Sequence, residues 1–247
     1  MNRNVKKGQS PRETALNIMY RVSEKDAYAN LELNKVLNRE DFNPLDRSFI
    51  TELVYGTIRM QGALDYILSL YIKKPLKSLP VWIHLILRMG VYQIVFLDKV
   101  PDRAAVNESV NLAKKYGHAG TVKLVNGVLR NVARGKEGLT YPLLDQDPLE
   151  HISSFYSHPR WLVERWLHQF GREETLRLCA WNNTSPQVTL RTNTLKISRE
   201  ELIFRLEKEG IRCFPGRYVP ESIILEGIVS LDSLAAYQEG LFQVQDE

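Results

Sequence analysis

Apolar residues recur at helical spacing through most of the first 135 residues. A capping box at Ser10-Pro11-Arg12-Glu13 predicts a helix from about Pro11 to Lys25, and the same spacing predicts helices near 31–37, 44–58, 64–71, 103–116 and 121–134. The segment 81–97 differs, because it is apolar on nearly every side, and such a helix is usually buried all round. The pattern therefore indicates a helical bundle with 81–97 as its central helix.

The pattern changes twice after residue 135. Residues 135–147 hold two glycines, a proline and no sustained period, which favours a hinge. Helices are expected to restart at Asp147-Pro148, to break at His158-Pro159, and to continue over 160–170 and 173–181. From Pro186 onward, period-two alternation and turn residues predict strands at 188–193, 211–214, 222–225 and 241–244, with a helix at 199–209 and a helical turn at 234–237. This order, β-α-β-β-α-β, is typical of a small ferredoxin-like domain with its helices on one face of the sheet.

We therefore expect a mostly α-helical chain with a small α+β part. Its expected divisions are a helical domain at residues 1–135, a helical linker at 136–185 and the small domain at 186–247. A chain of 247 residues that is 44% hydrophobic and 25% charged is ordinary for a globular protein. No apolar run approaches the roughly 20 residues that a membrane span needs, and the N-terminus lacks the apolar core of a signal peptide. We expect a cytoplasmic protein with no membrane partner.

The distribution of charge indicates a polyanionic partner. The net charge is +4, yet residues 1–140 hold 22 Lys and Arg against 13 Asp and Glu, while residues 141–247 hold 11 against 16. A basic first part makes nucleic acid the first candidate partner, although a solvated surface with no partner explains the composition as well.

Three cations of the last bundle helix, Lys123, Arg130 and Arg134, are expected on the side opposite its apolar residues. Such a row suits contacts with RNA phosphates, and a solvated helix face is the alternative. Lys6, Lys7 and Arg12 near the N-terminus form either a basic RNA-binding arm or a frayed tail.

Two later segments also carry candidate RNA-binding residues. His158, Arg160 and Trp161 place aromatic rings beside a cation, which suits unpaired bases, unless Trp161 packs into the core with its neighbours. Arg191 and Asn193 share the face of a strand opposite its apolar residues. They face either nucleic acid or another domain, and the strand lacks the aromatic pair of an RNA-recognition motif.

Asn126-Gly127 lies in the middle of a predicted helix, where a glycine costs about 1 kcal/mol relative to alanine. That cost suggests that another backbone approaches closely, so helix packing is favoured over a functional role. Asn107-Glu108 on the preceding helix could hydrogen-bond there. Lys73, Lys74 and Lys77 flank Pro75 in a loop and are expected to be solvated.

Three blocks resemble the NusB family. They are Leu87-Arg88-Met89-Gly90-Val91-Tyr92-Gln93, Val106-Asn107-Glu108-Ser109-Val110 and Val125-Asn126-Gly127-Val128-Leu129-Arg130. The resemblance covers roughly residues 10–135 and implies an all-helical RNA-binding fold.

Four further blocks resemble the ribosomal RNA small subunit methyltransferase B family, also called Sun or Fmu. They are Ser157-His158-Pro159-Arg160-Trp161-Leu162, Asn183-Thr184-Ser185-Pro186, Leu190-Arg191-Thr192-Asn193-Thr194 and Gly240-Leu241-Phe242-Gln243-Val244-Gln245-Asp246. The family joins a NusB-like domain, a helical linker and a ferredoxin-like domain to a C-terminal methyltransferase domain. The resemblance thus implies S-adenosylmethionine-dependent 5-methylation of a cytosine in 16S ribosomal RNA, in which a thiolate adds to C6 of the base and a second cysteine helps to release the product.

The residues that would catalyse this reaction do not match. The family's cysteines lie in Pro-Cys and Thr-Cys contexts, whereas Cys179 follows Leu178 and Cys213 follows Arg212, so both are interpreted as structural. The glycines form no cofactor loop, and the five histidines have no metal-ligand spacing with the cysteines. We therefore assign no catalytic, cofactor-binding or metal-binding residue.

The resemblance places the stretch at 240–247 as the last strand before the methyltransferase domain. The sequence therefore predicts an RNA-binding N-terminal part of a ribosomal RNA methyltransferase that folds by itself, contacts a C-terminal methyltransferase domain and is inactive alone. A stand-alone NusB-like antitermination factor and a protein-binding helical module are the alternatives. Whether the chain is itself an enzyme stays open.

Overall fold

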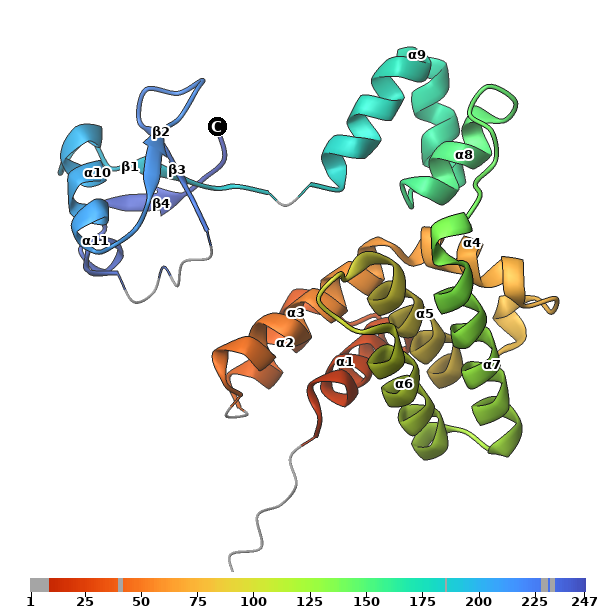
Figure 1. Cartoon of the computed structure of the whole chain (residues 1–247). Coiled ribbons are helices and arrows are strands. Elements are labelled where there is room, and N and C mark those ends of the chain that lie inside the picture. Colours follow the sequence, from red (N-terminus) through yellow and green to blue (C-terminus); the bar gives the residue numbers. More distant parts are fainter. Residues whose placement is uncertain (1–8, 40–41, 185, 228–230, 232–233) are drawn as a thin grey trace, which may run out of the picture. The chain divides into compact units, whose positions relative to one another are not determined.

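The computed structural model describes residues 9–39, 42–184, 186–227, 231 and 234–247. The chain divides into two compact units, Met1–Asn183 and Thr184–Glu247. Figure 1 shows that the first unit is helical and that the second contains the sheet.

The bundle of the first unit follows the expected order of helices. Its elements are α1 (Pro11–Lys25), α2 (Ala29–Leu37), α3 (Pro44–Arg59), α4 (Gln61–Tyr71), the 3-10 turn η1 (Leu76–Ser78), α5 (Val81–Phe96), α6 (Asp102–Tyr116) and α7 (Ala119–Gly135). The starts of α1 and α3 are set by side-chain caps, because Ser10 and Asn43 accept hydrogen bonds from backbone N–H groups of the first turn at 3.3 and 2.9 Å. The predicted start of α1 and its end at Lys25 are confirmed.

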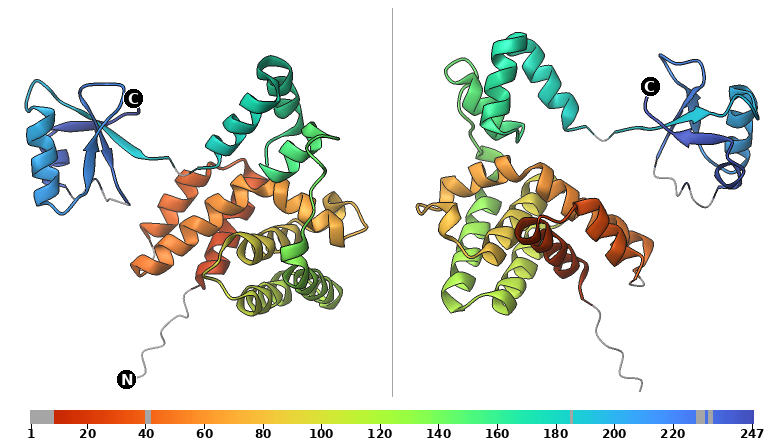
Figure 2. Two further views of the ribbon diagram at one scale, coloured as in Figure 1. Left: turned by 45° about the horizontal axis from the view of Figure 1, so that its top comes forward. Right: turned by 180° about the vertical axis from the view of Figure 1, so that it is seen from behind.

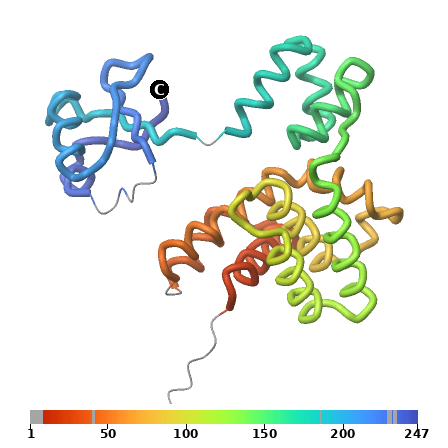
Figure 3. Tube along the Cα trace, in the orientation of Figure 1, coloured from red at the N-terminus to blue at the C-terminus, as the bar shows by residue number. Residues whose placement is uncertain are grey.

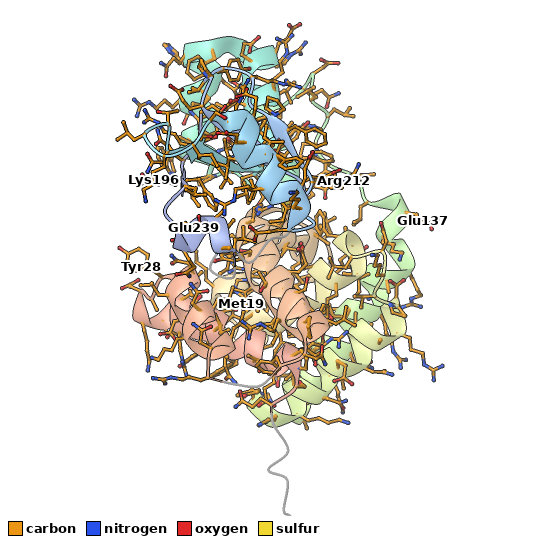
Figure 4. All side chains as sticks on the ribbon, turned by 90° about the vertical axis from the view of Figure 1, so that its left-hand side faces the viewer. Met19, Tyr28, Glu137, Lys196, Arg212 and Glu239 are labelled. Atoms are coloured by element: carbon orange, nitrogen blue, oxygen red, sulfur yellow. The ribbon has the colours of Figure 1, made fainter. Side chains whose placement is uncertain are left out.

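Helix α5 is the centre of the bundle, as its all-round apolar character predicts. It contacts α1, α3, α4, α6 and α7, and Figures 2 and 3 show these helices arranged around it. Ile83, Ile86 and Leu87 are fully buried there, and Met19 of α1 lies inside the same bundle (Figure 4). The burial of α5 fixes the surrounding helices and leaves only their outer faces for partners.

Two glycines, Gly56 and Gly90, allow the helices to pack closely around α5. A Cβ on Gly56 of α3 would lie 2.0 Å from the Tyr92 hydroxyl, and a Cβ on Gly90 of α5 would lie 2.6 Å from Leu129 of α7. Neither position has room for a side chain, so glycine is required for the close approach.

A helical hairpin completes the first unit. It consists of α8 (Pro148–Phe155) and α9 (Arg160–Asn182), and α9 bends at Gly171, where φ is 75°. This bend divides α9 near the predicted break between 160–170 and 173–181. Ile152, Val163 and Cys179 form the buried centre of the hairpin.

The expected hinge segment is packed against the bundle. A second 3-10 turn, η2 (Lys136–Gly138), follows α7. Beyond this turn, the Tyr66 hydroxyl of α4 donates to the carbonyl oxygen of Thr140 at 3.1 Å. The ring of Tyr66 stacks on Tyr141 at 5.2 Å between centroids. The hairpin itself is attached where the Ser157 hydroxyl accepts from the N–H of Gly62 at 3.0 Å. The division into residues 1–135 and 136–185 stays a prediction.

The second unit has the predicted β-α-β-β-α-β order. Its elements are β1 (Val188–Thr192), α10 (Arg199–Lys208), β2 (Cys213–Pro215), β3 (Ser222–Leu225), α11 (Ala235–Gln238) and β4 (Phe242–Val244). The strands are antiparallel in the order β2-β3-β1-β4, with Leu190 opposite Ile223 and Val244. Figure 1 shows α10 and α11 on one side of the sheet. The ferredoxin-like fold expected for this segment is confirmed.

Candidate nucleic-acid interface

Helix α7 presents a basic outer face because its sequence is strongly two-sided. The helix begins where the His118 ring accepts from the N–H of Gly120 at 3.1 Å and the Thr121 hydroxyl accepts from the N–H of His118 at 2.9 Å. Val125, Leu129 and Val132 are then fully buried against the bundle. The opposite side of the helix must therefore face solvent.

Lys123, Arg130 and Arg134, here called the α7 cation row, lie on that exposed side. The row extends about 16 Å along the helix axis, a length that spans several phosphates of one RNA strand. Within the described part of the chain none of the three forms an ion pair, and Arg134 hydrogen-bonds only to Asn131 one turn earlier. The row is therefore exposed and without ion pairs to described residues, which suits phosphate binding. Its RNA contacts stay a prediction.

A hollow of about 480 Å³ between α6 and α7 adjoins the cation row. Its polar lining holds three cations, three amides and one carboxylate: Lys114, Lys123, Arg130, Asn107, Asn111, Asn126 and Glu108. Amide side chains can donate and accept hydrogen bonds at base edges, while the cations suit phosphates. The sequence analysis named Asn107 of α6 but missed Asn111 and Lys114, although the three recur at helical spacing on one side.

The packing role expected for Gly127 is wrong. Gly127 is exposed, and a Cβ built on it would meet no described atom within 4 Å. The close helix contact is made instead by Gly90 of α5, where a Cβ would lie 2.6 Å from Leu129 of α7 and 2.9 Å from Ser109 of α6. The expected hydrogen bond from Asn107-Glu108 is also not seen among the described residues, and Glu108 accepts from Asn111 of its own helix at 3.4 Å. Gly127 therefore leaves an open stretch of backbone beside the cation row.

Arg12 is used inside the bundle. Its Nε donates to the buried Gln93 side chain at 2.7 Å, and its guanidinium lies 4.8 Å from the centroid of the Phe49 ring. Burial lowers the pKa of Arg12, although nearby Glu108 opposes the shift. Arg12 thus connects α1 to α3 and α5, which limits its availability to RNA. Lys6 and Lys7 lie outside the described residues.

His158 and Arg160 also have partners within the hairpin. One ring nitrogen of His158 is 2.8 Å from the carbonyl oxygen of Tyr156, and the ring meets Trp166 edge to face at 5.6 Å. Burial lowers the pKa of His158, although the hydrogen bond to the Tyr156 backbone opposes the shift, and so favours the neutral ring. Arg160 forms an ion pair with Glu150. These residues shape the start of α9 and stay predictions as RNA contacts.

Trp161 does not belong to the core, so that alternative is wrong for this residue. Its side chain is 66% exposed, whereas Val163 of the same helix is fully buried and Trp166 is half-buried. The same side of α9 carries Arg165 and His168, both exposed. This combination was missed from the sequence, although the spacing of 161, 165 and 168 is that of one helix face.

Arg191 and Asn193 have different environments in the sheet. Arg191 is exposed opposite Gln243 of β4, on the side away from the buried Leu190. Asn193 instead donates to the carbonyl oxygen of Gly240 at 3.0 Å and accepts from the N–H of Leu195 at 3.3 Å. Its amide therefore fixes the turn before β4, and Arg191 is the more available of the two.

Both cysteines are buried and form no disulfide bond, in agreement with a structural role. Burial raises the pKa of Cys179 to about 11, which suppresses the thiolate that a nucleophile needs. No group of three or more His, Cys, Asp or Glu residues within the described ranges is placed to hold a metal ion. No helix in these ranges combines the length and apolar character that crossing a membrane requires.

Two family models match the chain in succession. Residues 9–134 match the NusB family. This chain belongs to the NusB family. Residues 158–232 match a second model, described as "Methyltr_RsmF/B-like, ferredoxin-like domain". Both resemblances expected from the sequence are thereby confirmed, and the NusB-family domain is the one that carries the α7 cation row.

Similar proteins match almost the whole chain. The "Probable ribosomal RNA small subunit methyltransferase B" of Bacillus subtilis (strain 168) is 37% identical over 98% of this chain and 53% of its own length. A protein of the same name from Synechocystis sp. is 35% identical over 96% of this chain and 53% of its own length. The crystal structure of PH0851 has the same fold, with a TM-score of 0.65 and 21% identity over 97% of this chain and 54% of that one. The chain spans about half the length of the curated relatives it matches.

Proposed function

We propose that this chain is the RNA-binding part of a methyltransferase that acts on small-subunit ribosomal RNA. The observation that carries the proposal is the α7 cation row, exposed and without ion pairs to described residues, beside the amide-lined hollow between α6 and α7. Cations that already had carboxylate partners would gain little from phosphate. The names of the relatives from Bacillus subtilis and Synechocystis sp. support ribosomal RNA of the small subunit as the ligand.

The finer part of the proposal concerns the reaction. The names of the relatives support methylation of small-subunit ribosomal RNA. The family resemblance adds S-adenosylmethionine as the methyl donor, cytosine C5 of 16S ribosomal RNA as the target, the cytoplasm as the location, and a catalytic domain that contacts this chain. The residues described here do not fit that cofactor. The sheet is antiparallel, and β1 is followed by residues 193–198 without a glycine. No step of methyl transfer is assigned to this chain, which is proposed to bind RNA without methylating it.

Fluorescence anisotropy with a labelled hairpin from small-subunit ribosomal RNA tests the RNA-binding proposal. We expect affinity that falls steeply with salt, because phosphate contacts release counterions. No binding at low salt, or binding without salt dependence, would refute the proposal and favour a protein-binding module. Calorimetry with S-adenosylmethionine tests the finer part: no heat of binding is expected, and measurable binding by this chain would contradict it.

A further inference from the structure

One side of α9 exposes an indole ring beside two basic side chains. Trp161, Arg165 and His168, here called the Trp161 face, follow one another at helical spacings of four and three residues, so they share a side of the helix. All three are exposed. None of their side chains forms a hydrogen bond, an ion pair or a ring contact with a described residue, in contrast to His158 and Arg160 nearby.

Packing does not account for the position of Trp161. The opposite side of the same helix buries Val163 and packs Trp166 and Leu167 into the centre of the hairpin. A tryptophan that is 66% exposed leaves most of its apolar ring in water. A single exposed aromatic ring is common on protein surfaces, so the basic side chains beside Trp161 are what indicate a ligand.

The surroundings of the ring favour a nucleotide over a protein. Trp161, Arg165 and His168 border a hollow of about 620 Å³, whose other lining residues are Glu164 and Gln169. A protein-docking patch needs several hundred Å² of contiguous apolar surface, whereas this face offers a single indole among polar and basic groups. One aromatic ring next to a guanidinium matches one base and an adjoining phosphate.

We propose that the Trp161 face binds an unpaired nucleotide of the RNA. The base stacks on the indole of Trp161, and Arg165, one helical turn along the axis, contacts the adjoining phosphate. Glu164 disfavours a phosphate on its own side of the hollow and so directs the RNA backbone toward Arg165. This proposal rests on the proposed RNA-binding function and adds to it a preference for RNA with unpaired bases, which the α7 cation row does not provide.

Binding of two RNA probes by the whole chain tests the proposal. The probes are a single-stranded oligoribonucleotide and a fully paired RNA duplex of the same length, each measured by fluorescence anisotropy. Stacking of one base contributes enough that Trp161→Ala should weaken single-strand binding by about 5- to 150-fold. Duplex binding should not change, and Trp161→Phe should retain most of the single-strand affinity because it keeps an aromatic face.

Phe170→Ala is the matched control. Phe170 is exposed on the same helix, but nine residues from Trp161 and therefore on the opposite side. The Phe170→Ala variant should bind both probes with the affinity of the unaltered chain. Circular dichroism and thermal unfolding should show that Trp161→Ala and Phe170→Ala are folded, because neither side chain is part of the buried centre of the hairpin.

The outcomes separate this proposal from the one on which it rests. Equal affinity of Trp161→Ala and the unaltered chain for the single strand would overturn the nucleotide site, while salt-dependent binding of both probes would leave the RNA-binding function standing. Equal losses on both probes would also overturn it, because they would show no selectivity for unpaired bases. Unchanged RNA binding with an altered oligomeric state in sedimentation would assign the Trp161 face to a protein contact. Failure of the unaltered chain to bind either probe would refute the RNA-binding function itself.

Discussion

Neutralising the α7 cation row should lower both the RNA affinity and its dependence on salt. The triple substitution Lys123→Gln, Arg130→Gln and Arg134→Gln removes three positive charges from exposed positions. None of the three forms an ion pair with a described residue, so the free energy of unfolding should change by no more than about 0.5 kcal/mol per site. A change in RNA binding would then report on the surface rather than on folding.

The expected magnitude follows from the number of cations. Each phosphate contact contributes about −0.9 to the slope of log K against log salt for a duplex and about −0.7 for a single strand. Three contacts therefore account for about −2.7 or −2.1 of the slope. Between about 50 and 200 mM salt, these three contacts should lower the RNA affinity of the unaltered chain by about 40-fold for a duplex and about 20-fold for a single strand. The triple variant should not show this part of the loss.

The assay is fluorescence anisotropy with labelled ribosomal RNA across that range of salt. A matched control is Lys73→Gln, Lys74→Gln and Lys77→Gln, which removes the same charge from exposed lysines in the loop that contains η1. None of these lysines forms an ion pair with a described residue either. The control should change the slope much less, because the loop lacks a row of cations along one helix face.

Two results would refute this reasoning. If the loop variant lost as much slope as the α7 variant, net charge rather than the α7 cation row would govern binding. If neither variant changed the slope, the RNA phosphates would be contacted elsewhere, and residues outside the described ranges such as Lys6 and Lys7 would be the next to test.

Further predictions concern stability and reactivity. Gly56→Ala should destabilise the bundle by about 1–3 kcal/mol in urea unfolding, because the new Cβ would collide with the Tyr92 side chain. Gly127→Ala should instead stabilise the chain by up to about 1 kcal/mol in the same assay, since its Cβ meets no described atom. Asp65 of α4 is hydrogen-bonded by Arg88 and His84 of α5. Burial raises the pKa of Asp65, but the hydrogen bonds from Arg88 and His84 outweigh burial and lower the pKa from 3.8. Ionised Asp65 therefore stabilises the fold at pH values above its unfolded pKa, and this stabilisation is lost as the pH falls through its lower folded pKa. Asp65→Asn should consequently make the free energy of unfolding depend less on pH in the acid range. Cys179 should resist a thiol reagent at pH 8 until urea unfolds the chain.

The sequence by itself determined most of the secondary structure, the helical bundle of the first unit and the ferredoxin-like fold of the second. Ser10 and Asn43 cap helices through backbone groups only three residues away, and apolar periodicity predicted the central position of α5. The order of strands and helices after Pro186 was likewise sufficient to predict a ferredoxin-like domain with its helices on one face of the sheet (Figure 1). These features depend on local hydrogen bonding and on which side of an element is apolar, and both are visible in a short stretch of residues.

The sequence could not determine which polar side chains are free. Arg12 is engaged by Gln93, which is 81 residues away, and Asn193 is engaged by Gly240, which is 47 residues away. The tertiary structure also brought Lys114 and Arg130 to the lining of one hollow and left Trp161 exposed on a helix that buries its other side. The physical reason is that a polar or aromatic side chain binds whatever packing brings near it. Its availability to RNA is therefore decided by long-range contacts, which periodicity does not encode.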